Sequence, residues 1–111
     1  VMASKFTIFK SSNGNFYFNL KAGNGEKVLS SQGYSYKSSC ENGIQSVKEN
    51  SIKDYRYEKK ISSNGKYFFV LNAGNGEIIG TSEMYESING RDNGIDVVKR
   101  NAPNAPIEDL S

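Results

Sequence analysis

The sequence contains no histidine and no tryptophan, and its 111 residues include one cysteine and two prolines. Structural zinc sites use four Cys or His ligands, and most acyl-transfer sites use His as the general base, so both chemistries lack their usual residues. The single cysteine, Cys40, cannot form an intramolecular disulfide. We therefore expect no catalytic residue, no metal ligand and no cofactor, and we assign the chain as a non-enzyme.

An excess of one charge and long hydrophobic runs are also missing. The net charge of +2 is far below the basic balance that neutralises the phosphates of duplex DNA. No apolar run approaches the roughly 20 residues that cross a bilayer, and residues 1–5 contain no apolar signal core. We expect a cytoplasmic protein without membrane contact, whose native chain begins at Met2 after a Val1 left from cloning.

Composition and length favour one folded unit. Hydrophobic residues make up 36% of the chain and charged residues 23%, which is typical of a globular domain rather than a disordered tail. A chain of this length has room for one core but not for two of ordinary size. We expect a single domain over residues 1–111, made of two repeats at about 5–55 and 56–110.

The repeat appears when the chain is compared with itself at a shift of 51 residues. Residues 12–26 then align with residues 63–77 without a gap, and the Asn-Gly-Ile at 42–44 aligns with the Asn-Gly-Ile at 93–95. Roughly half of the positions between 12 and 50 are identical to their partners, far more than chance gives. The chain is therefore a tandem duplication.

Each copy begins with hydrophobic residues at every second position, which is the period of a strand. Phe16, Phe18 and Leu20 share one face of such a strand, and the Asn-Gly pairs at 13–14 and 24–25 bound it. Asn-Gly suits tight hairpins, because both residues tolerate positive φ. The pattern predicts a three-stranded meander in each copy, with strands at 6–10, 16–22 and 27–31 in the first copy and at 78–82 in the second.

A helical period follows the meander. Cys40, Ile44 and Val47 are spaced as one apolar stripe of a helix. The capping-box pattern at 38–41 predicts the start of the first helix, with Ser35 as the alternative start.

The helices are predicted to stop at Asn50 and Asn101, and each is followed by a predicted strand, at 53–61 and 105–110. The fold class is therefore α+β: two β-β-β-α-β motifs that form one antiparallel sheet with two helices packed on one face. We expect a monomer with internal pseudo-twofold symmetry.

The combination of motifs in each copy resembles the YegP-like family of small bacterial proteins. These motifs are Asn-Gly-x-(Phe/Tyr)-x-Phe-x-Leu-x-Ala-Gly-Asn-Gly-Glu, then Ser-x-x-Tyr, then Asn-Gly-Ile-x-x-Val-Lys, and the resemblance covers nearly the whole chain. It implies two β(3)-α-β motifs in one sheet, with the last strands exchanged between the halves. The family brings no established activity, so the resemblance implies no site residues. The second copy departs from the first at Met84, in place of Gly33, and at Arg91, in place of Cys40.

Several features have a structural explanation that outweighs a functional one. The two Ala-Gly-Asn-Gly-Glu loops resemble anion cradles, but they join strand to strand and lack the Lys-Ser/Thr of a phosphate-binding loop, so we interpret them as hairpins. Glu26, Glu77, Glu41 and Asp92 are matched acidic positions, which hairpin ends and helix starts explain. Cys40 lies on the apolar stripe without a histidine to activate it, and we interpret it as a core residue.

The face of the sheet away from the helices is the surface on which we expect binding. The predicted strands place aromatic and basic residues there, and single-stranded RNA readers stack bases on such faces. The candidate ligand-binding residues are Tyr17, Lys21, Arg56 and Phe68. Because aromatic residues also simply suit strands, a non-catalytic binding or interaction module for a protein or small ligand is the main hypothesis. Single-stranded nucleic-acid binding on the open sheet face is the lower-ranked alternative, and we do not expect a nucleic acid as the partner.

Overall fold

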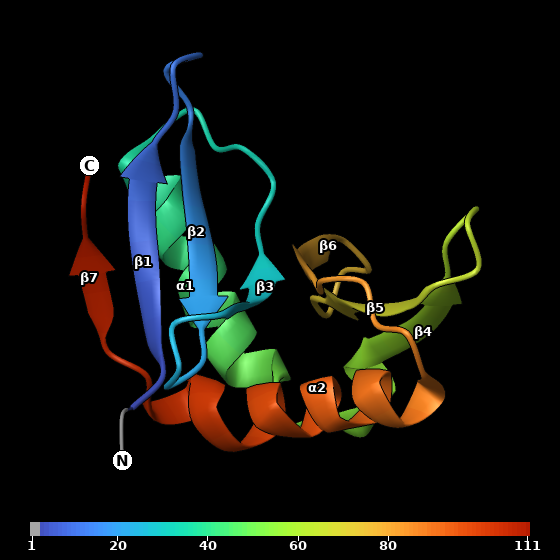
Figure 1. Cartoon of the computed structure of the whole chain (residues 1–111). Helices are drawn as coiled ribbons and strands as arrows, with labels where there is room; N and C mark the ends of the chain where they lie inside the picture. Colours follow the sequence, from blue (N-terminus) through green and yellow to red (C-terminus); the bar gives the residue numbers. More distant parts are fainter. Residues whose placement is uncertain (1–2) are drawn as a thin grey trace.

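Seven strands form one sheet, in the order β4-β5-β6-β3-β2-β1-β7, in the computed structural model, which describes residues 3–111 (Figure 1). The expected start at Met2 lies outside the described residues. The first half contains β1 (Lys5–Lys10), β2 (Phe16–Lys21), β3 (Lys27–Ser30) and α1 (Lys37–Asn50). The second half contains β4 (Tyr57–Ile61), β5 (Tyr67–Asn72), β6 (Ile78–Thr81) and α2 (Ile88–Asn101), and the chain ends in β7 (Ile107–Asp109). Short 3-10 helices, η1 (Asp54–Arg56) and η2 (Ala102–Asn104), follow the two α-helices.

The predicted α+β tandem fold is confirmed, with one difference in the sheet. Hairpins join the strands within each meander, so those strands pair antiparallel. β7 instead pairs parallel with β1, which makes the sheet mixed. The reason is the connection: β7 follows the helix of the second half and crosses to the first half, where it runs alongside β1.

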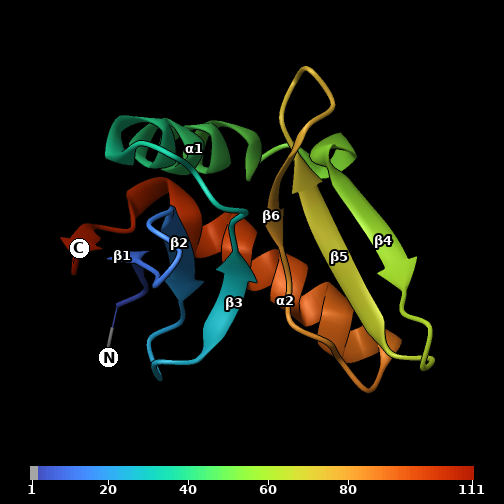
Figure 2. The ribbon, with the colours of Figure 1, turned by 90° about the horizontal axis from the view of Figure 1, so that it is seen from above.

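Both helices cover the same face of the sheet, which is strongly turned between its two halves (Figures 1 and 2). Each half contributes to a single buried cluster that includes the aromatic pair Phe6 and Phe18, whose ring centres lie 5.9 Å apart edge to face. Cys40, Ile44 and Val47 of α1 are buried in this cluster, as their spacing predicts. Each α-helix has 14 residues, and none in the described chain has the length and apolar content needed to span a membrane.

The helices end at Asn50 and Asn101, as predicted, but the predicted starts are wrong. α1 begins after Tyr36, which caps it without a side-chain hydrogen bond, so the capping box at 38–41 lies inside the helix and Ser35 lies before it. Residues 35–41 contain several serines, each of which could cap a helix. The choice is made by Tyr34, which is bridged to β2 and leaves only two residues before the helix. In α2, Ser87 is the cap and its Oγ accepts a hydrogen bond from the Gly90 N–H at 3.0 Å.

The Asn-Gly turns form the hairpins that the sequence predicts. They do so with positive φ at the glycine alone, whereas the prediction rested on positive φ at both Asn and Gly. Only the glycines adopt positive φ, at +86° in Gly25 and +89° in Gly76, and no other residue type does so among residues 3–111. In the first of these loops, the Gly25 N–H donates to the Ala22 carbonyl at 2.9 Å and the Asn24 side chain accepts from the Glu26 N–H. These are three-residue loops that end in a left-handed glycine.

The two halves meet at β3 and β6, where the pairing is short. A single pair of residues, Ser30 with Thr81, forms the ladder, and these two positions are equivalent under the repeat. An approximate twofold axis therefore passes between them. Next to the axis, Leu29 packs against Gly80, which is its own equivalent in the second half: a Cβ on Gly80 would lie 2.5 Å from a Leu29 methyl carbon.

Replacing Gly25 or Gly76 by Ala is expected to reduce the free energy of unfolding by about 1–2 kcal/mol, because a β-carbon is strained in the left-handed region. A Cβ at either site meets nothing within 4 Å, so the loss reports backbone strain alone. Urea unfolding of both single variants and the double variant measures the loss, which should be additive. Gly74→Ala in the same loop, at an ordinary φ, is the control and should be nearly neutral. A neutral Gly76→Ala contradicts the assignment.

The packing of Leu29 against Gly80 predicts a strong coupling between these two positions. Gly80→Leu should cost about 1–3 kcal/mol by overpacking, and Leu29→Gly about 2–5 kcal/mol by leaving a cavity. The swapped variant, Leu29→Gly with Gly80→Leu, should be more stable than the sum of the two losses by about 0.5–3 kcal/mol. Urea unfolding of the four chains gives the coupling energy. Purely additive losses would show that the two residues do not share the space at the axis.

Candidate functional site

The two equivalent strands β1 and β4 differ in what lies on their outer edges. β1 is paired with β2 on one side and with β7 on the other. β4 is paired with β5, and within residues 3–111 no strand lies on its other side (Figure 2). The chain therefore covers one of two equivalent edges and leaves the second open.

Backbone hydrogen bonds and ion pairs together hold β7 on the edge of β1. The Phe6 N–H donates to the Pro106 carbonyl at 2.8 Å, and the Ile8 carbonyl accepts from the Leu110 N–H at 2.8 Å. Two side-chain contacts accompany them: Lys5 Nζ lies 2.9 Å from Glu108 Oε1, and Lys37 Nζ lies 2.9 Å from Asp109 Oδ2.

The equivalent backbone groups of β4 point away from the sheet. Phe6 pairs with Leu20 on β2, and the equivalent residue Tyr57 pairs with Leu71 on β5 in the same register. Since Phe6 and Ile8 direct their amides and carbonyls to β7, Tyr57 and Lys59 direct theirs outward. The outer edge of β4 thus offers hydrogen-bonding groups in the register that β1 uses for β7.

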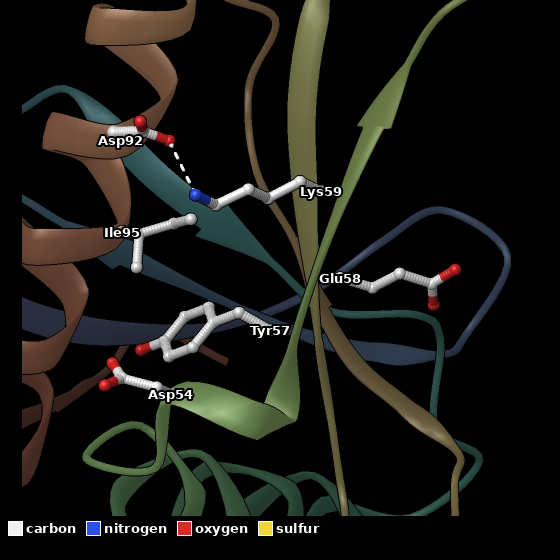
Figure 3. Close-up of a pocket in the computed structure, with 6 residues that line it drawn as sticks. All are labelled: Asp54, Tyr57, Glu58, Lys59, Asp92 and Ile95. Atoms are coloured by element: carbon white, nitrogen blue, oxygen red, sulfur yellow. Dashed lines mark ion pairs between the residues drawn. The ribbon is translucent and has the colours of Figure 1, made fainter.

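A groove runs beside this edge, between β4 and α2 (Figure 3). It has a volume of about 640 Å³. We call it the β4 groove, and the residues that line it are Asp54, Tyr57, Glu58, Lys59, Asp92 and Ile95. Figure 3 shows the side chains of Tyr57 and Lys59 on the side of the helix, whereas Glu58 points to the opposite face of the strand.

The groove has an apolar floor at Tyr57. The ring of this residue packs edge to face on Phe69, with centres 5.7 Å apart, and its hydroxyl donates to the Ser51 carbonyl at 2.7 Å. Burial raises the pKa of Tyr57 above its ordinary value, so the phenol stays neutral and acts as a fixed part of the floor. Ile95 lies on the α2 wall beside it.

The rim of the groove is charged and internally paired. Lys59 Nζ lies 3.2 Å from Asp92 Oδ1, across the groove, and Arg91 Nε contacts the same carboxylate at 3.2 Å. The hydrogen bond from Lys59, followed by the one from Arg91, lowers the pKa of Asp92, so the carboxylate is ionised at neutral pH. Solvent screens this exposed pair, so it orders the rim more than it stabilises the fold.

No activated nucleophile occurs in or near the groove among residues 3–111. Cys40 is fully buried on the other helix, and burial raises the pKa of its thiol to about 11, which keeps it protonated and inert. Within the same residues, no three acidic or Cys side chains lie close enough to hold a metal ion. The arrangement of an open strand edge, an apolar floor and a charged rim is of the kind that binds an extended chain.

The four residues predicted from the sequence do not gather into one surface. Tyr17 lies on β2 and Phe68 on β5, with β3 and β6 between these strands in the sheet. Tyr17 is engaged within the protein, since its ring stacks on Phe9 at 5.7 Å and its hydroxyl accepts a hydrogen bond from Asn13. Lys21 ends β2 on the same half as Tyr17, and ligand binding at these positions stays a prediction.

Phe68 lies on β5 opposite Lys60 of β4, and Arg56 lies immediately before β4. Its guanidinium carbon is 4.8 Å from the centre of the Tyr55 ring. Its Nε is buried and, within the described chain, has no hydrogen-bond partner.

Sequence reasoning missed the β4 groove, although the repeat contained a signal for it. The buried Ile8 of β1 is replaced by Lys59 in β4, and the buried Thr7 by the exposed Glu58. Such exchanges at equivalent positions indicate that something covers one strand and not the other. Before β7 is known to pair with β1, these exchanges look like ordinary divergence between the two copies.

Single-stranded RNA or DNA is expected to bind weakly or not at all at physiological salt, because the net charge is small and the aromatic residues of the open face are split between the halves. Fluorescence anisotropy with labelled oligonucleotides tests this, with a salt series as the control. Micromolar, salt-sensitive binding that is lost in Tyr17→Ala or Phe68→Ala would contradict the expectation and make the open face the site.

Comparison with known proteins places the chain in a family. The family model described as a domain of unknown function, DUF1508, matches twice, at residues 11–58 and 62–109. The UPF0339 protein YegP of Escherichia coli K12 is 49% identical over 108 residues, covering 97% of this chain and 98% of that protein. The solution NMR structure of a UPF0339 protein from Shewanella oneidensis has a TM-score of 0.92 at 49% identity, covering 98% of this chain and 92% of the other. That of yegP from E. coli has a TM-score of 0.93 at 48% identity, with coverage of 99% and 95%. With a tandem pair of DUF1508 units and close relatives over its whole length, the chain belongs to the UPF0339 family, which carries no assigned function.

Proposed function

We propose that the protein is a non-catalytic interaction module and that the β4 groove, with the outer edge of β4, is its binding surface. The observation that carries this is the difference between two equivalent edges: β7 covers β1, whereas β4 presents the same outward backbone groups uncovered. An exposed strand edge is a template for pairing with another chain, and recognition by strand addition uses such edges.

The charges on β4 support a selective use of this edge. Natural proteins protect open edges against indiscriminate pairing with charged side chains, lysine above all. β4 carries Glu58, Lys59 and Lys60, which are more than a third exposed in their side chains. These charges disfavour pairing between two copies of β4, because Lys59 of each copy would approach Lys59 of the other. A partner whose charges complement those of β4 can form hydrogen bonds with its outward backbone groups.

The lack of an activated group supports a binding role over an enzymatic one. Cys40 is the nucleophile with the greatest intrinsic reactivity in the chain, and it is buried and protonated. Asp54 and Asp92, two of the carboxylates that line the groove, form ion pairs with Lys99 and Lys59 respectively. A cytoplasmic location and a monomeric state stay predictions.

The proposal is tested by selecting displayed eight-residue peptides of random sequence on the immobilised full chain and measuring their affinity for two variants. Lys59→Pro removes the outward N–H of residue 59 and should weaken binding at least about tenfold, since proline tolerates an edge position but cannot donate. Lys59→Ala removes the same ion pair with Asp92 but keeps the N–H, and should change affinity only a few-fold.

Two results would contradict the proposal. One is a set of selected peptides that bind Lys59→Pro as well as the unmodified chain, because their site would then lie elsewhere. The other is an equal loss in Lys59→Ala and Lys59→Pro, because the lysine side chain would then be the contact rather than the edge. NMR spectra of both variants, with unchanged β5 signals, verify that the sheet is intact.

A further inference from the structure

We infer that the occupant of the β4 groove is an extended segment of a partner protein that runs parallel to β4 and carries an acidic residue between two apolar ones. This inference rests on the proposed function and specifies its ligand. The chain supplies an internal precedent in β7, which lies parallel on the equivalent strand β1. The differences between the two halves then define how the partner of β4 must differ from β7.

The direction and register follow from β7. Ile107, Glu108 and Asp109 lie opposite Phe6, Thr7 and Ile8, and the hydrogen bonds from Phe6 and to Ile8 bracket them. Transferred by the 51-residue shift, three partner residues lie opposite Tyr57, Glu58 and Lys59. We call these partner positions one, two and three. Positions one and three point towards α2, and position two points to the open face.

Position one faces apolar surface. Its counterpart in β7 is Ile107, and the strand residue opposite changes only from Phe6 to Tyr57. Ile95 on α2 is equivalent to Ile44 on α1, so the helix wall is also apolar in both halves. Ile44 is buried whereas Ile95 is only partly so, which leaves apolar area for the partner to cover.

Position two lies opposite Glu58, whose carboxylate is already paired with Lys60 at 3.4 Å, and it lies beside a cation. Its counterpart Glu108 pairs with Lys5 at 2.9 Å, and the equivalent of Lys5 is Arg56. The guanidinium of Arg56 is held by Tyr55 and lies near the backbone of Gly74, where a Cβ would be 3.4 Å from its nitrogen. Its buried Nε has no partner in the described chain, and no carboxylate of the same residues pairs with the guanidinium, so a carboxylate at position two can neutralise its charge.

Position three lies opposite Lys59, whose ammonium is already paired with Asp92 at 3.2 Å, and it meets apolar residues where β7 meets a cation. Lys37, which pairs with Asp109, is replaced by Ile88 in the second half, and Lys10 is replaced by Ile61. Both isoleucines are exposed, at 50% and 65%. An acidic residue at position three would also approach Asp92 across the groove. An apolar side chain is therefore favoured here.

This change at position three separates the partner from the chain's own last strand. β7 lies at the opposite end of the sheet from β4, with five strands between them, so it does not reach β4 within one molecule. In a second molecule, β7 would bring Asp109 against Ile88 and close to Asp92 and would lose its own contact with Lys37. A partner with an apolar residue at this position has neither disadvantage.

The test uses two synthetic peptides and the full chain labelled with 15N. One peptide has the sequence of residues 103–111, and the second has the same sequence with Asp109→Val, so that its positions one to three read Ile-Glu-Val. NMR titration should show amide shifts in residues 57–61 and at Ile88 and Ile95, with the valine peptide binding at least about fivefold more tightly than the native sequence. Arg56→Lys should retain most of this affinity, and Arg56→Gln should lose it.

N-methylated versions of the valine peptide test the strand pairing itself. In the β7 register, the N–H of the residue after position three bonds to the strand, as the Leu110 N–H bonds to Ile8, and the N–H of position three points away. Methylation of the former nitrogen should reduce affinity about tenfold or more, and methylation of the latter should leave it within about twofold. Equal effects of both would overturn the parallel register.

The remaining outcomes separate this inference from the proposed function. Tighter binding of the native sequence than of the valine peptide, or shifts confined to residues 5–10 where the peptide displaces β7, would overturn the inference. If neither peptide binds while selected peptides bind at the β4 groove in the Lys59-dependent manner above, the inference fails and the proposed function stands. If light scattering shows that the chain self-associates and Lys59→Pro abolishes this, the occupant is a second copy and the inference fails.

Discussion

The contact between Leu29 and Gly80 is the constraint that joins the two halves into one sheet. A single bridged pair connects β3 to β6, so backbone pairing alone holds the halves weakly together at this point. The glycine lets the leucine side chain cross the approximate twofold axis and pack into the common core. Because the sheet is continuous there, α1 contacts strands of both halves, and so does α2. The side-by-side placement of the two meanders in one sheet depends on this junction.

The repeat made much of the fold predictable. A pattern that occurs twice averages out local ambiguity, so the meanders and the helix ends at Asn50 and Asn101 follow from alternation and stop signals in both copies. Helix starts were not predictable, because the bridge between Phe16 and Tyr34 decides where the chain leaves the sheet. That bridge is a long-range contact, and no local capping pattern contains it.

The candidate site could not be derived from motifs, because it arises from the strand edge that the duplicated fold leaves unpaired. β4 serves both as the strand that follows the first helix and as the first strand of the second meander. The strand after the second helix, β7, has only the outer edge of β1 to join. One edge is therefore always left without a partner from the same chain. The exchanges of Ile8 for Lys59 and of Thr7 for Glu58 indicate this open edge in the sequence, but they can be interpreted only once the cover over β1 is known.

The unlike pair on the axis also bears on the history of the chain. Two first halves brought together would set Leu29 against a second Leu29, and two second halves would set Gly80 against Gly80, with a clash in one case and a void in the other. At this position each half is therefore complementary to the other half but not to a second copy of itself. An ancestral dimer of identical units would have needed one residue that fits its own image at this position. In this chain the two positions are complementary, and neither half presents at the axis a residue that fits its own image.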